Sequence, residues 1–189
     1  MKIDTLGEFT FHAGRPWLDF IATQADLHAT QPLERLSDTS RLAEWLRRGM
    51  GAEPEVKVTE ADLDLARWAR DALQALADSA IAGTAPPIAA VAAANRAIEP
   101  YTPPRAWVDE GRLRHSGPHS VETAMSWLAL EAVLMLSGDD ARQLRRCAAD
   151  DCGDVFADPS GRRRWCPGDR CGVKQRVRAH RERNRETGS

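Results

Sequence analysis

Four cysteines are the residues whose type and spacing most clearly imply chemistry. They follow the pattern C-x4-C-x13-C-x4-C near the C-terminus, at Cys147, Cys152, Cys166 and Cys171. Two pairs of thiols, each on a tight turn, suit the tetrahedral coordination of one structural Zn²⁺ ion. A closed shell of four thiolates leaves no position for a reactive water, so the metal is predicted to hold shape rather than to catalyse.

Other uses of these thiols stay open from the sequence: two disulfides, a redox switch, or an iron centre. Disulfides need an oxidising compartment, and residues 1–8 lack the apolar segment of a secretory signal. The longest apolar-rich run, residues 124–136, is too short to span a bilayer and contains Glu131. We therefore expect a cytoplasmic protein that is not a membrane protein.

Charge is distributed unevenly along the chain. Residues 1–141 carry 13 basic and 21 acidic side chains, whereas residues 142–189 carry 13 basic and 7 acidic ones. The segment that contains the cysteines is thus basic and the rest is acidic, which favours contact between the basic segment and a polyanion. A length of 189 residues with 42% hydrophobic content suits one medium domain and a small appendage.

Residues 1–140 are predicted to form a mainly α-helical body. The expected helix starts and stops are Pro16, Ser37 or Asp38, Gly49 and Gly51, the capping pair Thr59 and Asp62, Pro86-Pro87, and Pro100. The third helix is expected to bury Leu65, Trp68, Ala69, Ala72 and Leu76. Residues 121–136 are apolar around most of their surface and predict a central buried helix. Residues 107–113 predict a small β-hairpin, because Gly111 can adopt the positive φ of a tight turn.

Residues 141–189 are predicted to form a zinc module. Val155 and Phe156, followed by the turn-forming residues 158–161, predict a β-hairpin knuckle, and Trp165 is expected to shield the metal. A basic helix is expected over about residues 170–186. Its apolar seam, Val173 and Val177, is expected to dock the helix on the knuckle.

The basic helix presents cations at a spacing that matches a phosphate backbone, so nucleic acid, and DNA in particular, is the expected partner. The predicted contacts are Lys174, Arg176, Arg178, Arg181 and Arg185, with Arg162, Arg163 and Arg164 from the neighbouring loop. A solvated charge run that only neutralises the thiolate centre is an alternative reading of these residues. So is a zinc-stabilised module that binds a protein, an anionic membrane surface or a ligand without nucleic acid.

The remaining candidate sites are weaker. Gly117-Pro118 separates His115 from His119, which argues against a second metal site, and His180 could only compete with a cysteine for the zinc. The sequence has no nucleophile-elbow, P-loop, dinucleotide-binding or HExxH motif, so we predict no catalytic residues and no enzyme. The body is expected to sense or to dimerise. Its tryptophans are expected in the core, or lining a pocket for a small apolar effector: Trp17, Trp45, Trp68, Trp107 and Trp127.

The same residues resemble a known family. Arg146-Cys147, the Phe-x-Asp-x-Ser turn at residues 156–160, Arg164-Trp165-Cys166 and Cys171-Gly172 resemble the CGNR-type zinc finger. In bacterial proteins regarded as stress-induced transcription regulators this finger follows a helical ABATE domain, whose opening resembles residues 15–23 and 42–46. The resemblance implies an ABATE-like domain over 1–140 and a CGNR-like finger over 141–189.

The finger departs from the family pattern at one pair of residues. Val173-Lys174 stands where the family has Asn-Arg. Lysine can replace arginine as a point charge but not as a bidentate donor, and valine cannot hydrogen-bond through its side chain. Zinc binding is expected to survive this change.

Overall fold

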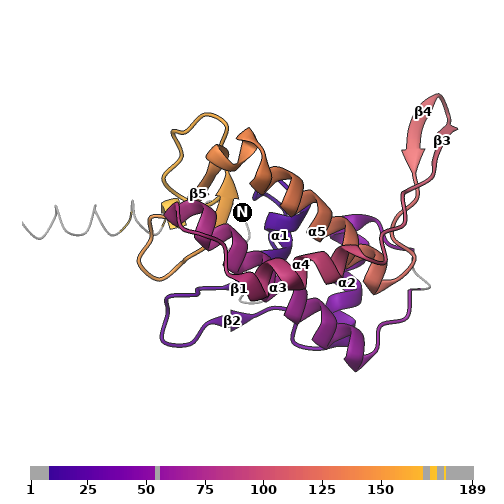
Figure 1. Cartoon of the computed structure of the whole chain (residues 1–189), viewed down its shortest axis with the longest axis horizontal. Coiled ribbons are helices and arrows are strands. Elements are labelled where there is room, and N and C mark those ends of the chain that lie inside the picture. Colours follow the sequence, from indigo (N-terminus) through magenta and orange to yellow (C-terminus); the bar gives the residue numbers. More distant parts are fainter. Residues whose placement is uncertain (1–8, 54–55, 168–170, 174–176, 178–189) are drawn as a thin grey trace, which may run out of the picture.

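The computed structural model describes residues 9–53, 56–167, 171–173 and 177. The predicted mainly α fold is confirmed in these residues (Figure 1). The helices are α1 (Pro16–Ile21), α2 (Thr39–Met50), α3 (Glu60–Ala82), α4 (Ile88–Ile98) and α5 (Val121–Ser137), followed by the 3₁₀ helix η1 (Asp139–Gln143). No helix in the described ranges is long and apolar enough to cross a bilayer.

Local capping chemistry sets the ends of these helices. Pro16 occupies the first turn of α1, and the Asp38 carboxylate accepts the Arg41 N–H at 3.0 Å at the start of α2. Thr59 and Asp62 form the predicted capping box of α3. Gly51 ends α2 with a φ of 64°, a conformation that costs glycine little.

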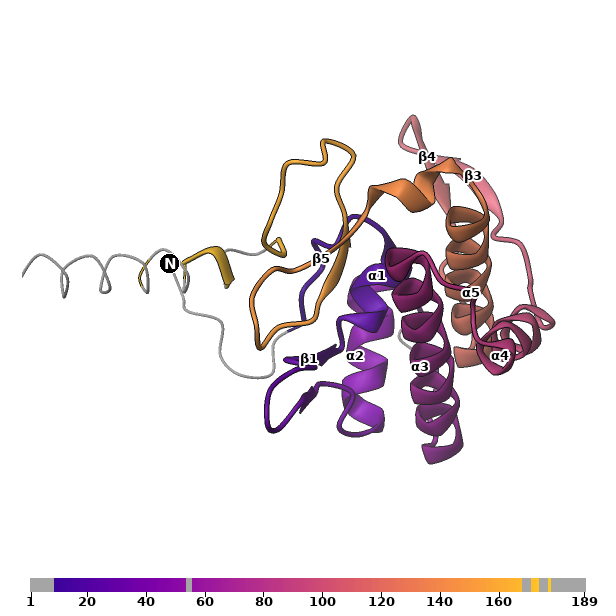
Figure 2. The ribbon, with the colours of Figure 1, turned by 60° about the vertical axis from the view of Figure 1, so that its left-hand side comes forward.

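The two longest helices form the centre of the body. Both α3 and α5 contact each of the other α-helices, and Figure 2 shows them running side by side. Met125, Leu128 and Ala132 of α5 are buried, which confirms the predicted central helix, although Leu134 is exposed.

The buried face of α3 differs in part from the prediction. Ala69, Ala72 and Leu76 are buried as predicted, and Leu63, Ala66 and Leu73 also face the core. Trp68, however, is 37% exposed. Alanine occurs on several sides of α3, so the periodicity of its apolar residues does not define a single buried face. Arg70, two residues after Trp68 and so on nearly the opposite side of the helix, is buried against Glu34.

Three two-stranded antiparallel sheets complete the described structure. They pair β1 (Gln24–Ala25) with β2 (Leu33–Glu34), β3 (Ala106–Asp109) with β4 (Arg112–His115), and β5 (Leu144–Arg146) with β6 (Val155–Ala157). The β3–β4 hairpin confirms its prediction. Its turn residues, Glu110 and Gly111, have φ values of 45° and 73°, and positive φ at both positions is typical of a type I′ turn.

A buried ion pair joins α3 to β2. The Arg70 side chain is only 3% exposed, and its Nη1 and Nη2 atoms each lie 2.7 Å from a carboxylate oxygen of Glu34. Arg70 Nη1 also lies 3.3 Å from the Thr23 hydroxyl. The bidentate pair compensates for the hydration that the Arg70 guanidinium loses when the fold buries it.

Replacing one partner of this pair tests its importance. We expect Glu34→Ala to lower the free energy of unfolding by about 3 kcal/mol, because the buried Arg70 guanidinium loses its bidentate partner and keeps, among the described ion pairs, only Asp71, 3.4 Å from its Nε. Urea unfolding followed by circular dichroism measures the change. Glu44→Ala is the matched control, since Glu44 pairs with Arg41 and Arg48 on the surface, and its cost is expected below about 1 kcal/mol. Equal costs for the two variants would contradict the argument.

Candidate metal centre and basic surface

The four cysteine sulfurs converge on one point. Their Sγ atoms all lie within 4.8 Å of one another, and all four residues are buried. The sulfurs of Cys152 and Cys166 are 3.9 Å apart and no cysteine is disulfide-bonded. A tetrahedral zinc with bonds of about 2.3 Å separates its sulfur ligands by roughly 3.8 Å, whereas a disulfide bond is about 2 Å long. The cluster therefore fits one structural zinc ion.

Short strands and turns position the thiols. The Cys147 N–H, directly after β5, donates to the Asp154 carbonyl at 2.9 Å, and the Cys152 N–H donates to Ala149 at 3.1 Å. The Cys166 N–H points at the Cys147 sulfur, 3.4 Å away. The four thiols lie in one buried cluster, and a bound cation would favour the thiolate form of each of them.

The knuckle differs in one respect from the expected hairpin. The strand that contains Val155 and Phe156 pairs with β5, which precedes Cys147, so the β5–β6 hairpin encloses the first cysteine pair. Residues 158–161 form the following turn and lead to Trp165. That side chain is half-buried against the core to which the cysteines belong, and its shielding of the metal stays a prediction.

The metal centre is seated on the helical body. The Leu27 N–H donates to the Cys152 carbonyl at 2.9 Å, and the Ala157 N–H donates to the Ala13 carbonyl at 2.7 Å. One hydrophobic core runs from the helices to the four cysteines and Phe156. In the region that Figure 2 labels β5 and α1, β6 contacts α1 and β5 contacts α3. The position of the centre relative to the body is thus fixed by backbone hydrogen bonds and by packing.

Arg146 and Gly153 tighten this joint. The Arg146 guanidinium lies 2.6 Å from the Asp78 carboxylate of α3 and 3.0 Å from the Gly153 carbonyl. Gly153 has a φ of 74°, and a Cβ there would lie 2.9 Å from Leu27 Cβ and 3.0 Å from His28 Nε2. The close approach of the two chain segments therefore requires glycine at this position.

Asp158 shapes the loop that follows β6. Its side chain is buried and accepts the Ser160 hydroxyl, the Ser160 N–H and the Arg163 N–H, the last at 2.7 Å. These hydrogen bonds, the Ser160 hydroxyl first, hold the pKa of Asp158 below its usual range. The carboxylate therefore stays ionised and orders the loop around it.

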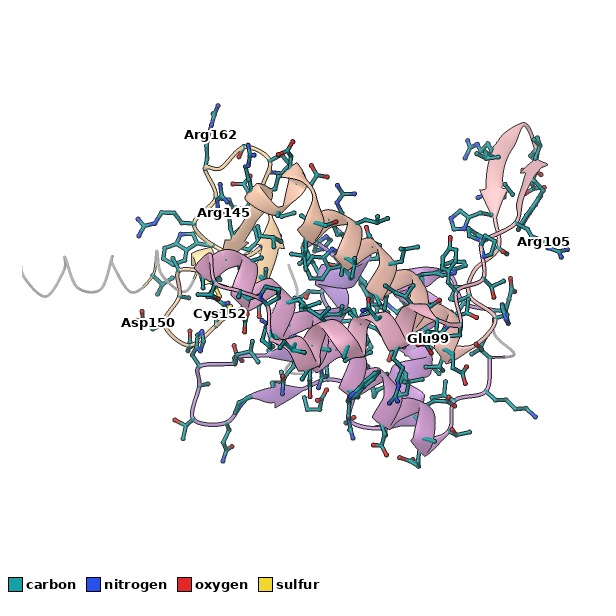
Figure 3. All side chains as sticks on the ribbon, in the orientation of Figure 1. Glu99, Arg105, Arg145, Asp150, Cys152 and Arg162 are labelled. Atoms are coloured by element: carbon teal, nitrogen blue, oxygen red, sulfur yellow. The ribbon has the colours of Figure 1, made fainter. Side chains whose placement is uncertain are left out.

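The ordered loop presents three arginines to solvent. Arg162, Arg163 and Arg164 are exposed, and within the described residues no ion pair includes them. The Arg164 guanidinium lies 5.3 Å from the centroid of the Trp165 ring. Figure 3 shows Arg162 pointing away from the body. The structure thus places these three predicted contacts beside the metal centre.

The other predicted contacts cannot be placed in the same way. Lys174, Arg176, Arg178, Arg181 and Arg185 lie outside the described residues, as does His180. Residues 171–173 and 177 are helical. The seam prediction is wrong, because Val173 and Val177 are both exposed. Gly172 lies nearest to Trp165 instead, and a Cβ there would be 3.5 Å from the Trp165 ring.

A polar cavity lies where the body meets the finger. It is open to solvent, has a volume of about 600 Å³ and is lined by Phe11, His12, Gly14, Arg15, Pro16, Asp19, Arg163 and Pro167. Burial raises the pKa of Asp19 to about 6. Arg15 lies 3.0 Å from Asp140, in an ion pair at the edge of α1. The cavity therefore collects charged groups from distant parts of the sequence.

The cavity differs from the tryptophan-lined pocket considered from the sequence. No tryptophan lines it: Trp17 and Trp45 are fully buried, while Trp68 and Trp107 are exposed. Sequence reasoning did not identify Arg15 and Asp19 as lining residues. The sequence did contain a signal for them. Both charged residues stand beside the apolar residues of α1, and a charged side chain in such a segment indicates a specific partner or a functional role.

Comparison with known families identifies two matching models. Residues 14–139 match the ABATE family, which is described as "Putative stress-induced transcription regulator". Residues 143–184 match the CGNR zinc finger. A comparison with curated proteins gave no match. Neither family description names an enzymatic activity.

Removal of one thiol tests the metal centre. We expect Cys166→Ser to reduce bound zinc from one equivalent to nearly none, because a hydroxyl does not replace a thiolate ligand. Since the cysteines belong to the same core as the helices, the unfolding free energy of the whole chain should fall by several kcal/mol. Elemental analysis and urea unfolding measure the two effects. Chelation of the unmodified chain should reproduce both, and full stability after chelation would contradict the shared core.

Proposed function

Because the chain belongs to the ABATE family and carries a CGNR zinc finger, we propose that this zinc-binding regulator acts in the cytoplasm by binding DNA. The observation that carries the proposal is the row of three exposed arginines, Arg162 to Arg164, held beside the metal centre by Asp158. Exposed guanidiniums on an ordered loop are suited to phosphate contacts.

The surroundings of each arginine separate structural roles from binding roles. Arg146 is committed to Asp78, and Arg145 donates to the carbonyls of Arg142 and Leu144 at 2.7 Å. These two side chains stabilise the finger. Arg162, Arg163 and Arg164 have no such commitment among the described ion pairs, so they are the arginines that a polyanion can recruit.

The uneven distribution of charge along the chain supports one orientation of the protein on DNA. Residues 142–189 carry six more basic than acidic side chains, whereas residues 1–141 carry eight more acidic than basic ones. The finger would therefore face the duplex and the body would face away from it. In this proposal the metal ion supplies no chemistry beyond holding the knuckle.

The basic helix completes the proposed surface. Its contacts would be Lys174, Arg178, Arg181 and Arg185, which the sequence spaces for one side of a helix, with Arg176 flanking them. They would bind phosphates as the loop does. We place the division between the regulatory body and the DNA-binding finger at residues 140–141.

The polar cavity supports a small organic anion as the effector. Arg163 and Arg15 would pair with a phosphate or carboxylate group, and Asp19 would accept a hydroxyl of the ligand. Arg163 belongs to both the cavity and the proposed DNA surface. An anion bound there would compete with a DNA phosphate, so the effector would weaken DNA binding.

A salt titration tests the DNA-binding surface. We expect the zinc-loaded chain to bind a mixed-sequence duplex with an affinity that falls steeply with salt. Arg162→Ala, Arg163→Ala and Arg164→Ala should each reduce the slope of log K against log salt by about one, because each substitution removes one phosphate contact. Fluorescence anisotropy at several salt concentrations measures the slope.

The matched control for this titration is Arg96→Ala on α4, which removes the same charge from the body. It should leave the slope unchanged. Unchanged binding in all three loop variants would contradict the proposed surface. Absence of duplex binding even at low salt would instead favour a zinc-stabilised module that binds a protein or a ligand.

A ligand titration tests the effector proposal. We expect ribose 5-phosphate or citrate at millimolar concentration to raise the melting temperature of the chain, whereas neutral ribose should not. Arg15→Ala should abolish the shift and leave DNA affinity unaltered, because Arg15 lies in the cavity and outside the proposed DNA surface. A shift that persists in Arg15→Ala would mark general salting-out rather than a site. No shift with either anion would contradict the proposal.

A further inference from the structure

The β3–β4 hairpin stands away from the helical body. Figure 1 shows it projecting at the end of the molecule opposite to β5. All residues of both strands are exposed, including Trp107, Val108 (73%) and Leu113 (78%). An isolated two-stranded hairpin is only marginally stable in water, so exposed apolar side chains here favour a partner that extends the sheet.

The register of the hairpin shows which backbone groups are available at its edges. The Ser116 N–H donates to the Arg105 carbonyl at 2.9 Å, so Arg105 bonds toward β4. Residues of an antiparallel strand alternate between its two sides, so Trp107 and Asp109 also bond toward β4. The N–H and C=O groups of Ala106 and Val108 therefore point to the free edge of β3.

The free edge of β3 is complementary to itself. A second copy can pair antiparallel with it about a twofold axis at Trp107, which places Trp107 opposite Trp107 of the second copy. Ala106 then lies opposite Val108 and supplies the hydrogen bonds, while Arg105 lies opposite Asp109 at both ends. The tryptophans would occupy a non-hydrogen-bonded pair, where opposed side chains approach most closely.

The free edge of β4 lacks this complementarity. Leu113 and His115 point their backbone groups to that edge by the same alternation. Pairing two copies about Leu113 would set Arg112 opposite Arg114, and a shift by one residue would set Arg114 opposite itself. Like charges directly opposite each other destabilise a strand pair, so the charges select β3.

We propose that two copies of this protein dimerise through β3 and form a four-stranded sheet in the order β4-β3-β3-β4. The interface is isologous, with one patch used by both subunits. It buries few residues, so micromolar affinity is expected for the free protein. Because the hairpin and β5 lie at opposite ends of the molecule, the two metal centres would lie at the outer ends of the dimer.

The dimer does not depend on the proposed function. If DNA binding holds as proposed, two fingers on one duplex would strengthen dimerisation through effective concentration. The tests below contain no DNA, so a failure of the dimer and a failure of DNA binding can be told apart.

Sedimentation of the zinc-loaded full chain tests the interface. We expect a monomer–dimer equilibrium between micromolar and submillimolar concentration. Arg105→Asp should weaken it about tenfold, because two attractive pairs with Asp109 become repulsive. Arg96→Asp on α4 is the charge-matched control and should leave the equilibrium unchanged. A chain that is monomeric throughout this range, or equal effects of both variants, would overturn the proposal.

Cross-linking distinguishes the two edges of the hairpin. Figure 3 shows the hairpin with Arg105 near its base, away from the metal centre. Under mild oxidation Trp107→Cys, on the twofold axis, should give a covalent dimer, whereas Leu113→Cys on the outer strand should not. The native cysteines are buried in the metal centre and should contribute little background. Faster cross-linking of Leu113→Cys would assign the interface to β4 and overturn the proposal.

Discussion

The convergence of four buried thiols on one metal ion is the constraint on which the C-terminal part of this protein depends. Between residues 144 and 167 the described structure contains only β5 and β6, each three residues long. So few residues bury too little apolar surface to hold two knuckles in place. Coordination supplies that free energy. The hydrogen bonds from Leu27 and Ala157 then fix the ordered centre to the body.

Arginine illustrates how surroundings, rather than residue type, decide a role. Arg70 is buried and matched by Glu34, so it stabilises the body. Arg146 spans the joint and meets Asp78 of α3. The loop arginines, 162–164, are exposed on a loop whose backbone Asp158 holds, and no described ion pair includes them. A count of positive charges would have treated all of these side chains alike.

The sequence predicted features that short spacings encode. The cysteine cluster, the caps of α2 and α3, and the turn at Glu110-Gly111 each depend on a few neighbouring residues, and the structure has them. Features that depend on distant packing were missed. The exposure of Trp68 follows from how α3 is rotated against its neighbours. The polar cavity joins Asp19 to Arg163, which are far apart in the chain and carry no shared motif.

The joint at Gly153 has a consequence for how this protein can change over time. Any side chain at Gly153 would clash with Leu27 or His28. Loss of Asp78 would leave Arg146 without its ion-pair partner. A body and a finger taken from different proteins would therefore fit only if these contacts matched. Positions 78 and 146 should covary among homologues, and a chimera that joins this body to a finger from a distant relative should misassemble unless the contacting residues travel with it.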